Sequence, residues 1–157
     1  MRIEIASISL IGIQEVGPSS FNDTANAGAK FGDSMWAKFI PKVAEAGLSL
    51  ERKMYGVSWP ADELTPPQHI HYFVGFELPE GFTHPEFEHF ELPGGGYFSY
   101  TYTGSMQEVD RGFADAYMNA LPASGLTPRE GLHLEVYPAD YDPTASEVTF
   151  QILIPVE

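Results

Sequence analysis

Ala46-Gly47-Leu48, then a strand-like run through Tyr55-Gly56-Val57, then Leu78-Pro79 form a pattern that this chain of 157 residues uses twice. The pattern returns in the same order and at almost constant separation as Ser124-Gly125-Leu126, Leu134-Glu135-Val136 and Ile154-Pro155. Two similar segments precede the two expected helices: Val16-Gly17-Pro18 and Thr103-Gly104-Ser105. Two copies of one unit predict a pseudo-twofold axis with a cleft along it. The copies differ most sharply where the first has Gly56 and the second has Glu135.

Each copy has the pattern of one strand, one helix and two further strands. Apolar residues recur at helical spacing from Phe31 to Val43 and from Val109 to Leu121, with Met118 on the apolar stripe of the second helix. Alternation and turn residues predict strands at 2–14, 53–59, 70–78, 97–103, 132–137 and 148–156. We therefore expect an α+β fold of tandem β-α-β-β repeats, with an antiparallel sheet, two helices on one face and a ligand cleft between the halves. One domain covers residues 1–157, with repeat one at about 1–79, a linker without elements at about 80–95 and repeat two at about 96–157.

Composition narrows the function classes. The net charge is −14 and Lys and Arg total only 8, so direct binding to nucleic acid is not expected. The acidity serves either solubility or the attraction of cations. The chain has no cysteine, no apolar run of the roughly 20 residues that span a membrane, and no apolar signal block at its N-terminus. These features predict a soluble, cytoplasmic protein that does not associate with membranes.

No motif predicts a metal or cofactor. The glycine run 94–96 lacks the spacing of a nucleotide-binding loop. Four histidines and one glutamate lie within 21 residues of one another without the spacing of a known metal motif: His69, His71, His84, Glu86 and His89.

Alternation divides the strand 132–137 between two faces of the sheet. The apolar phase suits a core covered by the helices and comprises Leu132, Leu134 and Val136. The opposite face then receives His133, Glu135 and Tyr137. If that face is open solvent, these are ordinary surface groups. If the two copies curve toward each other, Glu135 lies near the axis opposite Gly56 and lines a cleft, where an unpaired carboxylate is costly and calls for a ligand.

Alternation also suggests the walls of that cleft. Aligning Gly56 with Glu135 adds Met54 and Ser58 to the ligand face and leaves Tyr55, Val57 and Trp59 under the helix. In the strand 70–78 the apolar series from Ile70 to Leu78 suits the core, so His71 and Phe73 face the ligand side. Both phases of 97–103 carry aromatics, and the more complete aromatic set is assigned to the cleft: Phe98, Tyr100 and Tyr102. Aromatic rings beside a carboxylate favour planar or cationic organic molecules.

The segment Gly131-Leu132-His133-Leu134-Glu135-Val136-Tyr137-Pro138, with Asp140-Tyr141-Asp142-Pro143 and Ile152-Leu153-Ile154-Pro155-Val156 after it, resembles the carboxy-terminal signature of the GyrI-like small-molecule-binding domain. This family includes effector domains of AraC-type and MerR-type multidrug regulators. Three more segments resemble it in order: 10–18, the Tyr55-Gly56-Val57 strand with the Thr65-Pro66-Pro67 turn, and 96–104. The resemblance implies paired β-α-β-β modules, an aromatic pocket between them and a glutamate at its base, in whose place Glu135 stands.

Three functions follow as expectations. The leading one is a stand-alone protein that captures a hydrophobic or cationic small molecule between its halves, because neither end of the chain offers a helix-turn-helix pattern. The second is a hydrolase of reactive electrophiles, similar to some stand-alone family members, with Glu135 as general acid or base and Tyr100 or Tyr137 positioning the reactant. The third is an acidic partner of a basic protein such as a topoisomerase subunit, as the family's name implies.

Overall fold

The chain folds into one eight-stranded antiparallel sheet, with its helices packed on one face. The computed structural model describes residues 1–19, 27–65, 67–142 and 144–157, so Pro66 and Pro143, which contribute to the resemblance above, lie outside the described residues. The strands run in the order β1-β6-β8-β7-β3-β4-β2-β5. Their bounds are β1 Arg2–Ile5, β2 Ile8–Pro18, β3 Met54–Pro60, β4 His69–Glu77, β5 Glu88–Leu92, β6 Gly95–Gly104, β7 His133–Tyr137 and β8 Val148–Pro155.

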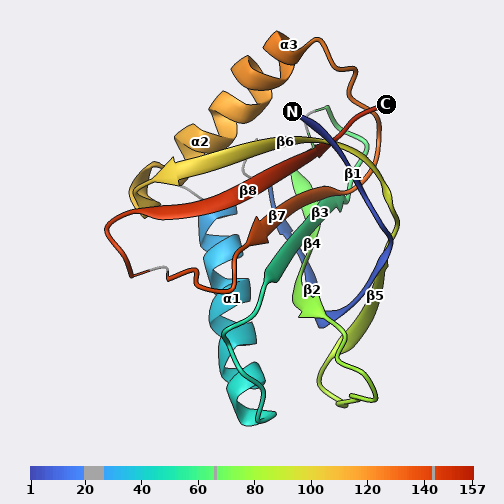
Figure 1. The fold of residues 1–157 in the computed structure, drawn as a ribbon, viewed down its shortest axis with the longest axis vertical. Helices are drawn as coiled ribbons and strands as arrows, with labels where there is room; N and C mark the ends of the chain where they lie inside the picture. The colour runs from blue at the N-terminus through green and yellow to red at the C-terminus, as the bar shows by residue number, and fades with distance from the viewer. Residues whose placement is uncertain (20–26, 66, 143) are drawn as a thin grey trace.

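Two helical segments cover the helix face, the name used here for the side of the sheet on which they lie. The first is α1, Ala27–Glu45; the second is a continuous series of η3 Met106–Glu108, α2 Val109–Asp115, the π-helical turn η4 Ala116–Ala120 and α3 Leu121–Ser124. Each is followed within two residues by a glycine with positive φ, Gly47 at 77° and Gly125 at 75°, a conformation that closes a helix at little cost for glycine. Figure 1 shows both helical segments on one side of the molecule and the edge strands β1 and β5 on the other.

The sheet curls, so that its second face, here called the inner face, is also buried. Ile5 of β1 and Leu92 of β5, from opposite edges of the sheet, belong to one apolar cluster that contains no helical residue. Leu134 and Val136 lie in this cluster, not under the helices as predicted. Tyr55, Val57 and Trp59 were assigned to the helix side and lie here as well. Alternation separates two faces of a strand, but it cannot tell which one carries helices when both are dry.

The buried residues of the two helical segments match the predicted apolar stripes in part. Met35, Phe39 and Val43 of α1 are fully buried, as the i, i+4 spacing requires. In the second segment Ala116 and Leu121 are buried, but Met118 is 70% exposed. The prediction for Met118 is wrong because the π-helical turn places Ala116 and Tyr117, not the next residue, against the sheet.

The predicted strand 2–14 and the predicted linker 80–95 both differ from the structure. Residues 6 and 7 separate β1 from β2, and the linker contains β5. In β5, Phe90 and Leu92 turn inward while Glu91 between them stays exposed, which is typical of a short edge strand. The described part of the chain therefore forms eight strands where alternation predicted six.

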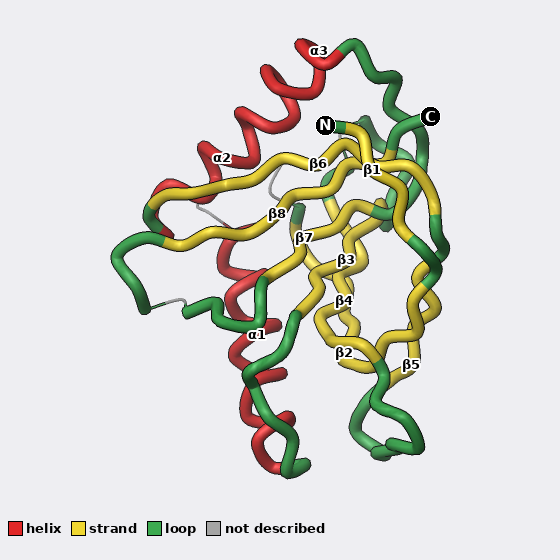
Figure 2. The backbone as a smooth tube through the Cα atoms, viewed as in Figure 1, coloured by secondary structure: helices red, strands yellow, loops and turns green. Residues whose placement is uncertain are grey.

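The two edge strands are exchanged between the repeats. β1 leads directly into β2, yet it pairs with β6 of the second repeat; β5 leads into β6, yet it pairs with β2 of the first. Figure 2 shows the two termini close together, and Arg2 Nε donates to the carbonyl of Glu157 at 3.2 Å.

The pairing registers relate the two halves of the sheet. Gly75 pairs with Tyr55 and Gly12 on its two sides, and Leu153 pairs with Leu134 and Ser99 in the same way. Tyr55 and Leu134 therefore occupy equivalent positions, as the repeat predicted.

The predicted match of Pro79 with Pro155 is wrong by two residues. Continuing from Gly75 and Leu153 along β4 and β8 makes Glu77 the equivalent of Pro155. Glu77 pairs with Leu10, and Pro155 pairs with the equivalent residue Tyr97.

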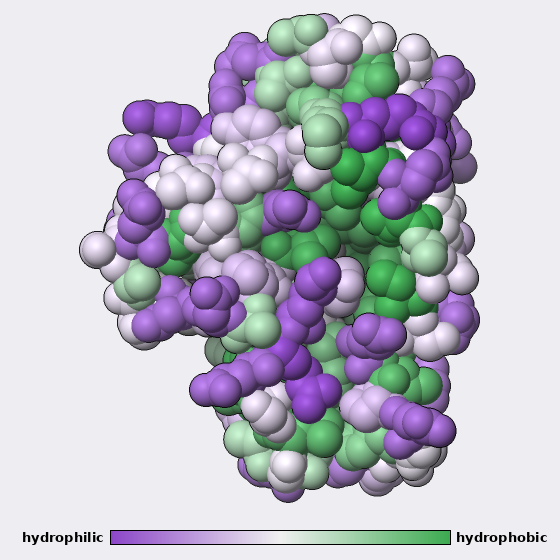
Figure 3. All heavy atoms as spheres, viewed as in Figure 1, coloured by the Kyte–Doolittle hydropathy of each residue, from purple (hydrophilic) through white to green (hydrophobic). Residues whose placement is uncertain are grey.

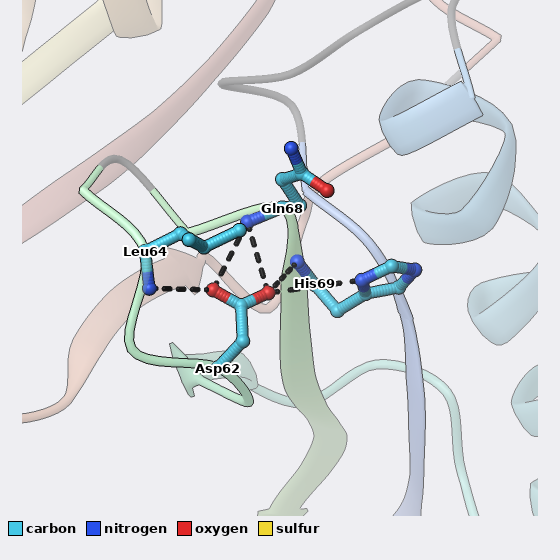
Figure 4. A network of polar contacts seen from close by, with 4 residues as sticks. All are labelled: Asp62, Leu64, Gln68 and His69. Atoms are coloured by element: carbon cyan, nitrogen blue, oxygen red, sulfur yellow. Dashed lines mark hydrogen bonds and ion pairs between the residues drawn. The ribbon is translucent and has the colours of Figure 1, made fainter.

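One face of the molecule is apolar over the middle of the sheet and polar around it (Figure 3). In the view of Figure 3, hydrophobic residues gather over β7 and β3 in the middle of the molecule, and hydrophilic residues surround them. At one end, the loop between β3 and β4 is held by a single carboxylate: Asp62 accepts hydrogen bonds from the backbone N–H groups of Leu64, Gln68 and His69 (Figure 4). The His69 ring lies 3.7 Å from the same carboxylate.

Candidate ligand-binding site

Glu135 lies where the two repeats meet. It pairs with Gly56 across the β7–β3 ladder, which joins the two halves of the sheet. On either side, Met54 pairs with Tyr137 and Ser58 pairs with His133. The rotation that superposes the repeats places the Met54–Tyr137 pair on the His133–Ser58 pair. The local axis therefore passes between Glu135 and Gly56.

Two tyrosines, one from each repeat, hold the Glu135 carboxylate. The hydroxyl of Tyr137 donates to Oε1 at 2.5 Å, and that of Tyr72 donates to the same oxygen at 3.0 Å. Trp36 Nε1 of α1 in turn donates to the Tyr72 hydroxyl at 3.2 Å. An ideal Cβ on Gly56 would lie 2.7 Å from the Tyr72 hydroxyl oxygen. The glycine therefore makes room for the tyrosine that reaches Glu135.

Burial sets the protonation behaviour of this cluster. Desolvation raises the pKa of Glu135, and the two tyrosine hydrogen bonds partly oppose that shift because they favour the carboxylate. Burial, together with the negative charge of Glu135, raises the pKa of Tyr72 and of Tyr137 well above their ordinary value. Both phenols therefore keep their protons at neutral pH and act as donors toward Glu135.

Aromatic rings surround the carboxylate. The Tyr137 ring lies 5.3 Å from that of Trp36, 4.8 Å from that of Phe150 and 4.8 Å from that of Tyr141. These rings come from α1, from both repeats and from the loop after β7. The carboxylate is not sealed beneath them, because Glu135 keeps an intermediate exposure.

His133 forms a second polar group beside Glu135. Its Nδ1 lies 2.6 Å from the hydroxyl of Tyr117 on the π-helical turn, and the two rings stack at 5.7 Å. Burial lowers the pKa of His133 to about 4, so the ring is neutral at pH 7.

The sequence prediction placed some residues on the wrong side. His71 and Phe73 were assigned to the face of Glu135, but they lie on the inner face, where His71 stacks on Trp59 at 5.1 Å and Phe73 stacks on Phe90 at 4.9 Å. The reason is the pairing register: Gly56 pairs with Val74, so the even-numbered residues of β4 share its face.

The other predicted residues lie on the helix face with Glu135. Tyr100 pairs with Ile152, which also pairs with Glu135, so the chosen phase of β6 is the one on that face. Phe98 and Tyr102 are buried beneath the second helical segment. The Tyr100 hydroxyl donates to Asp115 at 2.7 Å. That hydrogen bond directs Tyr100 toward α2, in a groove between β6 and α2.

Alternation missed four aromatic residues around Glu135: Trp36, Tyr72, Tyr141 and Phe150. Tyr72 was placed correctly under the helix, but that face was not recognised as the face of Glu135. The signal that could have found it is the cross-strand register, because a hairpin from Gly56 to Val74 brings Tyr72 diagonally next to Gly56.

Within the described residues, no three His, Asp or Glu side chains gather to hold a metal ion. The histidines noted in the sequence are dispersed: His69 lies at Asp62, His71 on Trp59, and His84 against Phe82 and Phe87. None of the described helices is long and apolar enough to cross a membrane.

Comparison with known proteins gives the class of this chain. The model of the GyrI-like small-molecule-binding domain matches residues 3–157, so the chain belongs to the GyrI-like small-molecule-binding family. The transcriptional regulator BrlR of Pseudomonas aeruginosa is 29% identical over 137 residues, which are 86% of this chain and 46% of BrlR. The chain thus spans about half the length of that curated relative.

Solved structures share the fold at low identity. The structure of SAV2435 bound to tetraphenylphosphonium has a TM-score of 0.73 and 17% identity, covering 100% of this chain and 93% of that one. The integron cassette protein VCH_CASS2 of Vibrio cholerae has a TM-score of 0.70 and 19% identity, with coverage of 100% and 95%. A hydrolase encoded by lin2189 of Listeria innocua has a TM-score of 0.53 and 14% identity, with coverage of 100% and 91%.

Proposed function

We propose that this protein binds a hydrophobic or cationic organic molecule on the helix face, between the two repeats, with Glu135 as the anchoring group. The observation that carries the proposal is the state of the Glu135 carboxylate. Among the described residues, both hydrogen bonds to this carboxylate reach Oε1, and no ion pair includes Glu135. A desolvated carboxylate without a counter-charge is costly, and a cationic ligand supplies the missing charge.

The surroundings of Glu135 fit such a ligand. The Tyr137 ring contacts those of Trp36 and Phe150 at 5.3 and 4.8 Å, and electron-rich aromatic faces attract organic cations. The net charge of −14 also raises the concentration of cations near the protein.

Tetraphenylphosphonium is the probe of choice, because it combines a delocalised positive charge with aromatic rings. Isothermal titration calorimetry should give a dissociation constant for the unaltered protein that rises about 10- to 100-fold in Glu135→Gln, the scale of a lost charged contact. The fold should survive, since glutamine retains the shape and an acceptor for the tyrosines. Glu88→Gln, an exposed glutamate of β5, is the matched control and should bind like the unaltered protein.

The pH dependence gives an independent check. A cation and a proton compete for Glu135, so affinity should fall as the pH is lowered through the pKa of Glu135, and the fall should disappear in Glu135→Gln. Equal affinity of Glu135→Gln and the unaltered protein would contradict the proposal.

Hydrolysis of a reactive electrophile is the second candidate function. It is favoured by the raised pKa of Glu135, which suits proton transfer, and by Tyr137 at 2.5 Å from the same oxygen. Glu135 would take a proton from water as the water oxygen bonds to the electrophilic carbon, and would return it to the leaving group as the bond to that group breaks. Tyr137 would position the carboxylate. Tyr100 does not support this function, because its hydroxyl is bonded to Asp115. An enzyme loses rate in Glu135→Gln while still holding substrate, whereas a receptor loses affinity.

A further inference from the structure

Two polar atoms on the floor of the site receive no hydrogen bond from the residues that the structure describes. They are Glu135 Oε2 and His133 Nε2, since the hydrogen bonds of these residues go to Oε1 and Nδ1. Across the described residues, the one side-chain polar atom that is both sealed from solvent and unpaired is His71 Nδ1, on the inner face. Glu135 Oε2 and His133 Nε2 therefore remain open to solvent or to a ligand.

The two residues present these atoms on the same side of the sheet at a fixed spacing. They stand two positions apart on β7, so their side chains point to one face about 6–7 Å apart. The residues opposite them on β3 are small, Gly56 and Ser58. The Tyr72 hydroxyl fills the space over Gly56, so the two polar groups of β7 lie beside small residues of β3 and this one tyrosine.

Tyr117 fixes the tautomer of His133. A neutral imidazole nitrogen is a better acceptor than a phenol oxygen, and a phenol is a better donor than an imidazole N–H. Across the 2.6 Å contact, Tyr117 therefore donates and Nδ1 accepts, which leaves the ring proton on Nε2. The stacked Tyr117 ring keeps the imidazole in this orientation. The open Nε2 is thus a neutral hydrogen-bond donor, and the open Oε2 belongs to the carboxyl group proposed above to bind a cation.

We propose that His133 Nε2–H selects ligands that carry a neutral acceptor, such as a ketone, ester or amide carbonyl, about 6–7 Å from the positive group that binds Glu135. The inference rests on the proposed function and adds to it: Glu135 binds the positive group of the ligand, and His133 binds a carbonyl oxygen at a fixed distance from that group. A cation without such an acceptor binds through Glu135 and the aromatic rings alone.

A matched pair of small cations tests the selection. The probes are 4-acetyl-N,N,N-trimethylanilinium and its 4-isopropenyl analogue, which differ only by C=O against C=CH2 and have nearly the same shape. In calorimetric titrations, the unaltered protein should bind the acetyl probe roughly three- to tenfold more tightly, the value of one net hydrogen bond. His133→Phe should bind both probes with the affinity of the weaker one.

Two control variants separate this effect from general damage. His71→Phe makes the same substitution on the inner face and should keep the preference for the acetyl probe. Glu135→Gln should weaken both probes by the same factor and keep their ratio.

Nuclear magnetic resonance of 15N-labelled histidine in the unaltered protein gives a reading that needs no variant. It should show the proton of the His133 ring on Nε2. A proton on Nδ1, or equal affinity of the two probes for the unaltered protein, overturns the selection by His133 and leaves the proposed function standing. If neither probe nor tetraphenylphosphonium binds, the proposed function fails, and the inference fails with it.

Discussion

Gly56→Ala tests the packing that brings Tyr72 to Glu135. The new Cβ would lie 2.7 Å from the Tyr72 hydroxyl and 3.1 Å from its ring edge. Tyr72 is only 4% exposed and is bonded to Trp36, so the ring has little freedom to move. The added methyl should therefore displace the hydroxyl and break its hydrogen bond with Glu135.

The expected cost follows from two opposing effects. A hydrogen bond to a charged group contributes about 1.5–3 kcal/mol, whereas replacing glycine by alanine in a strand returns roughly 0.5–1 kcal/mol. The net loss is about 0.5–2.5 kcal/mol, which lowers the melting temperature by about 1–10 °C in a chain of this size. Urea denaturation and calorimetry both measure it.

A double-mutant cycle with Tyr72→Phe isolates the cause. Phenylalanine lacks the hydroxyl, so the alanine then meets only the ring edge, and Gly56→Ala should cost less than about 0.5 kcal/mol in that background. If Gly56→Ala has the same effect in both backgrounds, the glycine does not make room for the Tyr72 hydroxyl and the reasoning is refuted.

Three further expectations concern the core and two titrating groups. Phe39→Ala should cost roughly 3–5 kcal/mol of unfolding free energy because Phe39 is fully buried. Leu64→Ala, at a 53% exposed position, should change the unfolding free energy by less than about 0.5 kcal/mol. Similar costs of the two substitutions in urea denaturation would contradict the position of α1. Partial desolvation tends to raise the pKa of Asp62, but backbone hydrogen bonds led by that of His69 outweigh it and hold the pKa below its usual value. The stability gained from this loop is therefore present at neutral pH and lost only as the pH falls through that lowered value. A titration of the Asp62 carboxyl carbon with a midpoint at or above the ordinary value would contradict this. The pKa of His133, about 4 in the folded protein, lies below the ordinary value of about 6.5. The unfolded chain therefore takes up the proton first, and stability declines as the pH drops from about 6.5 toward 4. A midpoint near 6.5 for His133 in a proton magnetic resonance titration would show that the ring is not desolvated.

Local patterns predicted the fold to the extent that the repeat constrains it. The pairing of Gly56 with Glu135 and the positive-φ glycines after both helical segments follow from short motifs that occur twice. β5 escaped prediction because three of its five residues are polar, two glutamates and a histidine, and the alternation of Phe90 with Leu92 is too short to stand out.

The site was predicted less completely than the fold. His133, Glu135 and Tyr137 follow from one strand and its resemblance to the family, because alternate positions on a strand share a face. Tyr72, Trp36 and Tyr141 come from other elements, and their approach to Glu135 depends on register and helix placement. The assignment of His71 and Phe73 failed for a related reason: a curled sheet has two dry faces, and an apolar series on one strand does not reveal which face another strand shares.

The exchange of β1 and β5 has a consequence for how the protein comes apart. Each repeat completes the sheet edge of the other, so separating the repeats would strip a strand from β2 and a strand from β6 at the same time and expose two unpaired edges. The repeats are interlocked, because each contributes the edge strand that pairs with the other. Partial opening at the β7–β3 ladder is thereby discouraged, and the seam that carries Glu135 should persist until the whole sheet melts in a single cooperative step.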